Sequence, residues 1–167
     1  YLLRHLCAPE GEAEGVSMAG NVAVGGVGCT KMDEHWTKSM RDLSTEAGLH
    51  ALKDAGIEGK AIEAMYIGSM SSGRFVGQEH LGALAVDQAG LTPIPATRCE
   101  GACASGALAF RKAYLSIRSG EYDIVIAAGG EKMTDIKGPD AIAALMGAGD
   151  HEWESATGAT FTGLYAI

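Results

Sequence analysis

The sequence predicts a single α/β domain built on a mostly parallel, mixed β-sheet that carries helices on both of its faces. Two observations support this fold class. Short runs of β-branched and small apolar residues alternate along the chain with longer stretches whose apolar residues recur at helical spacing. The 24 glycines among the 167 residues punctuate these segments without a repeat or a linker-like run. Because strands joined through helices form parallel pairs with right-handed crossovers, the alternation predicts a sheet between two helical layers.

The predicted elements alternate from residue 21 onward. In chain order they are a strand over residues 21–28, a helix over 39–55, a strand over 64–70, a helix over 79–88, a strand over 95–99, a helix over 103–118 and a strand over 122–128. Ser39 stands in an N-cap position and Gly56 supplies a C-terminal stop, so both ends of the first helix are marked. Ile124, Val125 and Ile126 in succession predict a last strand that is buried on both faces.

The chain divides into three predicted segments. Residues 1–18 are acidic and poorly patterned, and we expect a disordered or vector-derived leader that lies outside the fold. Residues 19–133 form the predicted α/β domain. In residues 134–167 the regular pattern lapses, and the apolar ending at Ile167 predicts a loop region that is cut short.

Composition and charge exclude several function classes. The formal net charge is −8 and the 13 Lys and Arg residues are scattered, which argues against nucleic-acid binding because phosphate neutralisation requires clustered cations. The longest apolar runs fall short of the ~20 residues that cross a bilayer, so no membrane span is expected. Cys7, Cys29, Cys99 and Cys103 accompany no signal peptide, and we expect reduced thiols in a cytoplasmic protein rather than a disulfide framework.

Residues 97–106 carry the most informative pattern in the sequence. The string Thr-Arg-Cys-Glu-Gly-Ala-Cys-Ala-Ser-Gly compresses a strand end, a turn of small residues and a helix start, and Cys103 falls at the turn. A thiol at a helix N-terminus meets unpaired backbone N–H groups and the positive end of the helix dipole, both of which favour the nucleophilic thiolate. Small neighbours leave room for a substrate. The pattern therefore indicates Cys103 as a candidate catalytic nucleophile.

Other interpretations of the cysteines stay open from the residues alone. Cys103 could be a small buried hydrophobe where helix meets sheet, which is the usual role of a free cysteine. Cys99 and Cys103 could bind a metal or form a redox pair, but their spacing is not C-x-x-C and no further Cys or His cluster follows, so we expect no metal site. Cys29, at the end of the first predicted strand, is expected in the core.

Several separated motifs resemble those of the thiolase family. Residues 102–106 (Ala-Cys-Ala-Ser-Gly) resemble its nucleophile motif, and residues 129–134 (Gly-Gly-Glu-Lys-Met-Thr) resemble the glycine-rich turn with a glutamate and a methionine that follows the next strand. Further segments that resemble the archaeal and sterol-carrier-like branch of this family are residues 54–57, 67–69, 73–80 and 158–165. The likeness covers about residues 21–167 and implies the N-terminal half of a thiolase-like fold.

The resemblance implies a two-step acyl transfer. Cys103 would take an acyl group from an acyl-CoA such as acetyl-CoA, and would pass it to the enolate of a second acetyl-CoA or to free CoA. The products would be a 3-ketoacyl-CoA such as acetoacetyl-CoA, or its cleavage products. Coenzyme A thioesters are substrates in this scheme, and no cofactor is implied.

The family's activating histidine and second cysteine belong to its C-terminal half, which this sequence does not match. We therefore expect the chain alone to be inactive and assign no catalytic role to its histidines, which are His5, His35, His50, His80 and His151. The resemblance also implies a homo-oligomer, a dimer or tetramer, in which the strand before the nucleophile pairs across a two-fold axis. A partner synthase that receives the product is a further expectation.

Two other functions remain alternatives. One is a non-catalytic scaffold subunit of a complex of CoA enzymes. The other is a related cysteine-dependent hydroxymethylglutaryl-CoA or ketoacyl synthase, against which the Ala-Ser-Gly after Cys103 favours a thiolase.

Four further residues and one stretch carry expectations. Arg74 could contact CoA phosphate or a partner subunit, or could be a solvated loop arginine. By resemblance, Met133 and the apolar stretch 141–146 begin the region that lines the acyl pocket. His50 is expected to face solvent, and His80 to be a capping or surface residue.

Overall fold

The computed structural model describes residues 1–6 and 21–166. Its strands are β1 (Leu2–Leu6), β2 (Asn21–Gly26), β3 (Ala64–Gly68), β4 (Ala96–Cys99) and β5 (Ile124–Gly129). Its α-helices are α1 (Met40–Ala55), α2 (Ser72–Val76), α3 (Leu81–Gln88), α4 (Ser105–Arg118), α5 (Gly138–Leu145) and α6 (Phe161–Leu164). Short 3₁₀ turns lie at Gly59–Ala61, Ala102–Ala104, Met146–Ala148 and Ser155–Thr157.

The strands form one mixed sheet in the order β2-β1-β5-β3-β4. β3 pairs in parallel with β4 and with β5, whereas β1 pairs antiparallel with β2 and with β5. Because β1 opposes both of its neighbours, β2 runs in the same direction as β5, β3 and β4. The prediction of a mostly parallel mixed sheet is confirmed.

The prediction that residues 1–18 lie outside the fold is wrong for residues 2–6. Residues 2–6 form β1 inside the sheet, and Leu2 and Leu3 are each only 1% exposed. The strand predicted from residue 21 is therefore the second one. A five-residue segment is too short to show periodicity, and its pairing with β2 and β5 is decided by contacts distant in the sequence. The remainder of that predicted leader, residues 7–18, lies outside the described residues.

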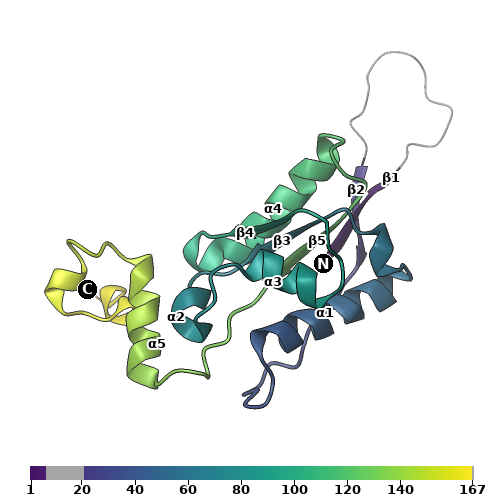
Figure 1. Ribbon diagram of the computed structural model, residues 1–167. Coiled ribbons are helices and arrows are strands. Elements are labelled where there is room, and N and C mark those ends of the chain that lie inside the picture. The colour runs from purple at the N-terminus through teal and green to yellow at the C-terminus, as the bar shows by residue number, and fades with distance from the viewer. Residues whose placement is uncertain (7–20, 167) are drawn as a thin grey trace, which may run out of the picture.

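Helices cover both faces of the sheet, as expected (Figure 1). On one face α1 and α3 pack on alternate strand residues, among them Leu2 and Ile126. On the other face α4 packs on the intervening residues, among them Leu3 and Val125. Since successive strand side chains point to opposite faces, this alternation divides the core into two layers. β5 is buried on both faces, as predicted.

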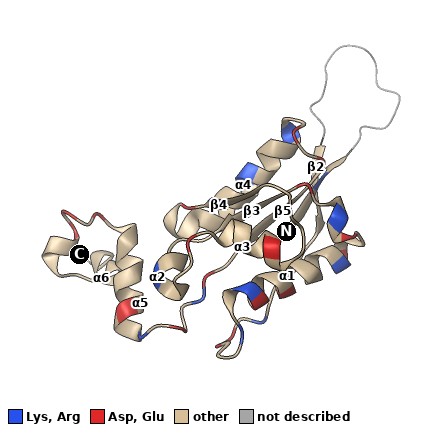
Figure 2. Ribbon diagram, in the orientation of Figure 1, with Lys and Arg blue, Asp and Glu red and all other residues tan. Residues whose placement is uncertain are grey.

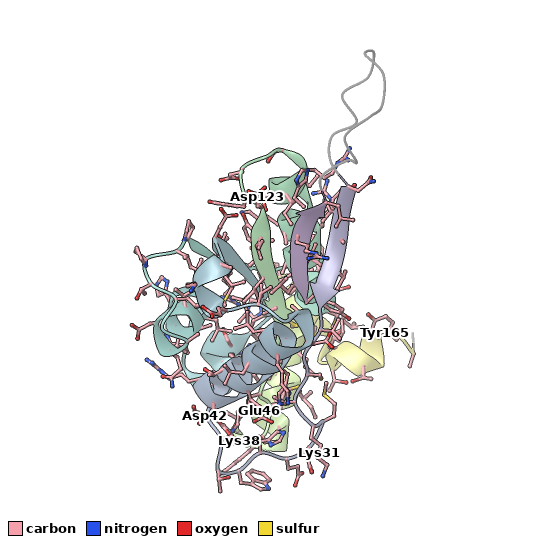
Figure 3. The ribbon with its side chains drawn as sticks, turned by 90° about the vertical axis from the view of Figure 1, so that its right-hand side faces the viewer. Lys31, Lys38, Asp42, Glu46, Asp123 and Tyr165 are labelled. Carbon is pink, nitrogen blue, oxygen red and sulfur yellow. The ribbon has the colours of Figure 1, made fainter. Side chains whose placement is uncertain are left out.

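The end signals of α1 act as the sequence predicts. The Ser39 side chain accepts a hydrogen bond from the Asp42 N–H, and the Asp42 side chain accepts one from the Ser39 N–H, which is a capping box. Gly56 ends the helix in a left-handed conformation with φ of 67°. The Lys38 ammonium and the Glu46 carboxylate lie 2.5 Å apart beside this first turn (Figure 3).

The other predicted elements form with small shifts at their ends, and α2 is an addition. α2 is a five-residue helix whose own sequence contains Gly73, so no helical periodicity reveals it. The predicted loop region after residue 133 also holds helices: α5, which begins with Pro139 in its first turn, and α6. Figure 1 shows α5 and α6 set apart from the three layers that α1, the sheet and α4 form.

Charged side chains are spread over the surface of the fold. Figure 2 shows Lys and Arg interspersed with Asp and Glu along α1, with others on α2, α4 and the connecting segments. Within residues 1–6 and 21–166, no helix combines the length and the apolar character that crossing a membrane would require.

Candidate active site

The candidate site lies where the parallel strands end. The registers place Gly68, the last residue of β3, opposite Cys99 of β4 and Gly129 of β5. Beyond these carboxyl ends an open cavity of about 500 Å³ is lined by the ends of β3 and β5, the turn before α4, and side chains from α2, α5 and the intervening loops. In sheets of this kind, ligands bind outside the carboxyl ends of the strands.

Cys103 lines this cavity from the 3₁₀ turn that joins β4 to α4. Its side chain is exposed and forms no disulfide. The interpretation of Cys103 as a small buried hydrophobe is therefore wrong, and the predicted place at a strand-to-helix turn is found. Its role as a nucleophile stays a prediction.

The turn around Cys103 is sharp and is held by local hydrogen bonds. Ala102 has φ of 48°, a left-handed conformation that costs an alanine about 1 kcal/mol. The Ser105 hydroxyl accepts a hydrogen bond from the Gly101 N–H at 3.0 Å and donates one to the Ala102 carbonyl at 2.6 Å. The Glu100 carboxylate accepts the Ala102 N–H at 2.6 Å. These bonds fix the backbone that presents Cys103 to the cavity.

Part of the cavity wall is bare backbone. A Cβ added at Gly68 would lie 2.4 Å from the carbonyl carbon of Ser105, so β3 and the start of α4 meet only because residue 68 is glycine. Gly106, Gly129 and Gly130 line the same cavity. Without side chains at these positions, a ligand can approach the backbone closely.

The N-terminus of α4 faces the same region. Ala104 occupies the N-cap position and makes no side-chain capping hydrogen bond. The Ser105 N–H bonds the Ala102 carbonyl of the preceding 3₁₀ turn, and the N-terminus of a helix carries the positive end of the helix dipole. This end of α4 would favour a negative charge placed near Cys103.

Sequence reasoning missed two charged residues beside the cavity. Glu131 accepts hydrogen bonds from the Ser69 hydroxyl and from the Met70 N–H, both at 2.8 Å. Arg98 donates to the carbonyl oxygens of Ser69 and Met70. Glu131 lies within residues 129–134 and Arg98 within residues 97–106, two segments that the sequence analysis singled out, but only the fold shows that both bind the loop after β3.

The other described cysteines lie outside the cavity lining. Cys99, at the end of β4, is partly buried, and this burial raises the pKa of its thiol while the Lys112 ammonium opposes the rise. Cys29 is exposed, so its expected place in the core is wrong. It follows β2 in a segment that has left the sheet, and its Sγ lies 3.1 Å from the Thr30 carbonyl oxygen. Cys29, Cys99 and Cys103 are all free, and the described residues hold no group of three or more potential metal ligands.

His50 and His80 lie on the surface. His50 of α1 is exposed, as predicted, with its Nδ1 3.0 Å from the Cys29 carbonyl oxygen. His80 is exposed at the N-cap of α3, where its side chain makes no capping hydrogen bond. Among the described residues, no histidine lines the Cys103 cavity.

The expectations for Met133 and the stretch 141–146 differ in outcome from that for Arg74. Met133 and Leu145, from the two stretches expected near the acyl pocket, both line the Cys103 cavity. Arg74 is exposed and donates a hydrogen bond to the Ala143 carbonyl at 2.9 Å, which joins α2 to α5. This bond gives Arg74 a structural role that none of its expected interpretations included.

Comparisons with known proteins show what this chain is similar to. Residues 23–163 match the family model described as "Thiolase, N-terminal domain". Acetyl-CoA acetyltransferases of Methanothermobacter thermautotrophicus and Methanocaldococcus jannaschii are 55% and 53% identical over 88% of this chain. The alignments span 38% and 37% of those relatives, so the chain corresponds to well under half of their length.

More distant proteins are similar over less of the chain. Sterol carrier protein 2 of Bos taurus is 37% identical over 72% of this chain and 22% of that protein. The crystal structure of 3-oxoacyl-[acyl-carrier-protein] synthase III from Aquifex aeolicus superposes with a TM-score of 0.50 at 18% identity, over 59% of this chain and 31% of that one. This last likeness concerns the fold alone.

Proposed function

This chain belongs to the thiolase family, and from that premise we propose that it takes part in acyl transfer between coenzyme A thioesters with Cys103 as the acyl carrier. The named relatives are acetyl-CoA acetyltransferases, which supports acetyl-CoA as the donor. The observation that carries the proposal is the exposed Cys103 in a strained strand-to-helix turn that lines a cavity.

The first chemical step is an exchange of thioesters. The Cys103 sulfur attacks the carbonyl carbon of acetyl-CoA, the bond from that carbon to the CoA sulfur breaks, and CoA leaves as a thiol with the proton that Cys103 gave up. The positive end of the α4 dipole supports this step, because negative charge develops on the thioester oxygen as the sulfur attacks.

The second step removes the acetyl group from Cys103. An enolate of a second acetyl-CoA accepts it to give acetoacetyl-CoA, and in the reverse direction free CoA accepts the acyl group. The proton transfers of this step call for acid and base groups that the family carries beyond its N-terminal half. A partner synthase that receives the product of this step is part of the same proposal.

We also propose self-association through β4. This strand is the edge of the sheet, its only pairing in the described residues is with β3, and all four of its residues are partly exposed. An edge strand offers unpaired N–H and C=O groups to another strand. Two copies that pair through β4 would bring two Cys103 turns close to the interface.

The free thiols of Cys29, Cys99 and Cys103 fit a reducing cytoplasm as the location of this protein.

The test of the acyl carrier is trapping by mass spectrometry. After incubation with acetyl-CoA, we expect one acetyl group on the peptide that contains Cys103, with release of an equal amount of CoA thiol. Cys103→Ala should abolish both signals, whereas the matched variant Cys99→Ala should keep them. Acetylation that persists in Cys103→Ala would rule out the proposed carrier. A full-length protein, with the family's C-terminal half present, that binds acetyl-CoA and stays unlabelled would also rule it out and would favour a scaffold role.

A further inference from the structure

Two methionines that line the Cys103 cavity stand on separate loops, and one carboxylate joins these loops. Met70 lies in the loop after β3, residues 69–71, and Met133 lies in the segment after β5. Glu131, two residues before Met133, accepts the Met70 N–H at 2.8 Å through Oε2. Its Oε1 accepts the Ser69 hydroxyl at 2.8 Å. The backbone of one methionine is therefore tied to the loop that carries the other.

Arg98 holds the carbonyl groups of the same loop. Its Nη2 donates to the Met70 oxygen at 2.8 Å and to the Ser69 oxygen at 3.1 Å. Both backbone polar groups of Met70 are thus bound by charged side chains, one from β4 and one from the segment after β5. Hydrogen bonds to ionised groups are shorter and stronger than those between neutral groups. The guanidinium side chain is only 21% exposed, which limits the competition from water.

Further ion pairs hold Arg98 and the segment next to Glu131 in place. Arg98 Nη1 lies 2.6 Å from the Glu79 carboxylate, which fits beside α2 because a Cβ at Gly73 would lie 1.8 Å from Glu79 Oε1. Lys132, almost fully buried, pairs with Asp135. That pair fixes the backbone between Glu131 and Met133.

We propose that Glu131 and Arg98 are positioning residues that fix the spacing of Met70 and Met133 and thereby select the size of the acyl group that reaches Cys103. Methionine side chains are flexible, so a wall made of them is only as well defined as the backbone that carries them. The inference rests on the proposed function, because an acyl group is the ligand that this cavity would receive.

The test measures the size preference of Cys103 directly. Iodoacetamide and N-hexyl iodoacetamide share one reactive group and differ in the chain that must enter the cavity. The ratio of their rates of Cys103 modification, read by peptide mass spectrometry, reports the width of the site. In Glu131→Ala we expect the preference for the small reagent to fall by about threefold or more, since the loop is no longer held. Arg98→Lys, which keeps the charge but loses the forked donor, should shift the ratio in the same direction.

A double variant distinguishes positioning from general loosening. Met70→Ala should widen the site by itself, and adding Glu131→Ala to it should change the ratio little further, because Glu131 acts through Met70. Glu34→Ala, an exposed glutamate outside the cavity, should leave the ratio unchanged. A lowered melting temperature with an unchanged ratio in Glu131→Ala, or additive changes in the double variant, would overturn the inference.

Failure of this inference is distinguishable from failure of the proposed function. The alkylation ratio requires no acyl transfer. If the full-length protein forms no acetyl adduct while the ratio shifts as expected, the acyl carrier is wrong and the positioning stands. If the adduct forms and the ratio does not change, Cys103 carries the acyl group and the positioning role of Glu131 and Arg98 is wrong.

Discussion

At the scale of single residues, the site depends on positions where a larger side chain does not fit. Gly68 lets the end of β3 touch the backbone of Ser105, and Ala102 accepts a left-handed conformation directly before Cys103. These residues act through close approach rather than flexibility. The turn that presents the sulfur is therefore fixed by contacts with β3 as well as by its own hydrogen bonds.

We predict that Gly68→Ala destabilises the fold and Gly48→Ala does not. The new methyl group at residue 68 would lie 2.4 Å from the Ser105 carbonyl carbon, and overpacking of this kind costs about 2 kcal/mol. At Gly48, inside α1, a Cβ meets nothing within 4 Å, so the same change should stabilise the helix by about 0.5–1 kcal/mol. Urea unfolding measures both values. Equal stability of the two variants would contradict the close packing of β3 on α4.

At the scale of elements, α1 shows how a local signal determines a boundary. Ser39 and Asp42 satisfy each other's backbone N–H groups, and Gly56 closes the other end. Such caps operate within one turn of the chain, so they can be recognised without knowledge of the fold. α2 ends at a left-handed Gly77 but has no side-chain hydrogen bond at its N-cap. Its docking onto α5 through Arg74 joins segments that are distant in the sequence.

The capping box predicts a pH-dependent contribution of Asp42. Hydrogen bonds from the Ser39 N–H and hydroxyl lower the pKa of the Asp42 carboxyl below its usual value. A lowered folded-state pKa stabilises the fold above the unfolded-state pKa of about 3.9, and this stabilisation is lost as the pH falls through the lower folded value. Asp42→Asn should therefore lower the melting temperature at pH 7 and have little effect in strong acid.

The control for this prediction is Asp140→Asn. Asp140 also lies in the first turn of a helix, α5, but its carboxylate accepts no hydrogen bond from the described residues. Its substitution should change the melting temperature little at either pH. A loss in Asp42→Asn that is the same at neutral and acid pH would contradict the role of the carboxylate.

At the scale of the whole molecule, β1 joins β2 to the rest of the sheet. It lies between β2 and β5, and its successive leucines enter the two core layers, Leu2 with α1 and α3, and Leu3 with α4. The strand is thus part of the core although it lies at the start of the chain. Tyr1, directly before β1, also lines the cavity that holds Cys103.

We predict that Leu3→Ala destabilises the protein strongly and Leu6→Ala weakly. Leu3 is 1% exposed, and truncating a buried leucine to alanine costs about 2–5 kcal/mol. Leu6, in the same strand, is 39% exposed, and its truncation should cost less than about 1 kcal/mol. Denaturant unfolding compares them. If both substitutions cost equally little, β1 does not belong to the cooperative core.

Much of the fold follows from signals that lie close together in the sequence. The alternation of strands and helices, the caps of α1 and the compressed turn at residues 97–106 all involve neighbours in the chain, and the structure confirms each of them. Motifs with several matching residues, such as 102–106 and 129–134, also indicated the family, which the comparisons confirm.

By itself, the sequence determined the fold class, the strands and helices from residue 21 to residue 129 other than α2, and the place of Cys103 at a strand-to-helix turn. Only the tertiary structure decided that residues 2–6 join the sheet, that Cys103 opens onto a cavity, and that Glu131 and Arg98 hold the loop beside it. The physical reason is the distance along the chain over which each interaction acts. Propensity and capping act over one or two turns of chain, whereas a strand's partners and a carboxylate's donors are brought together by packing of the whole domain.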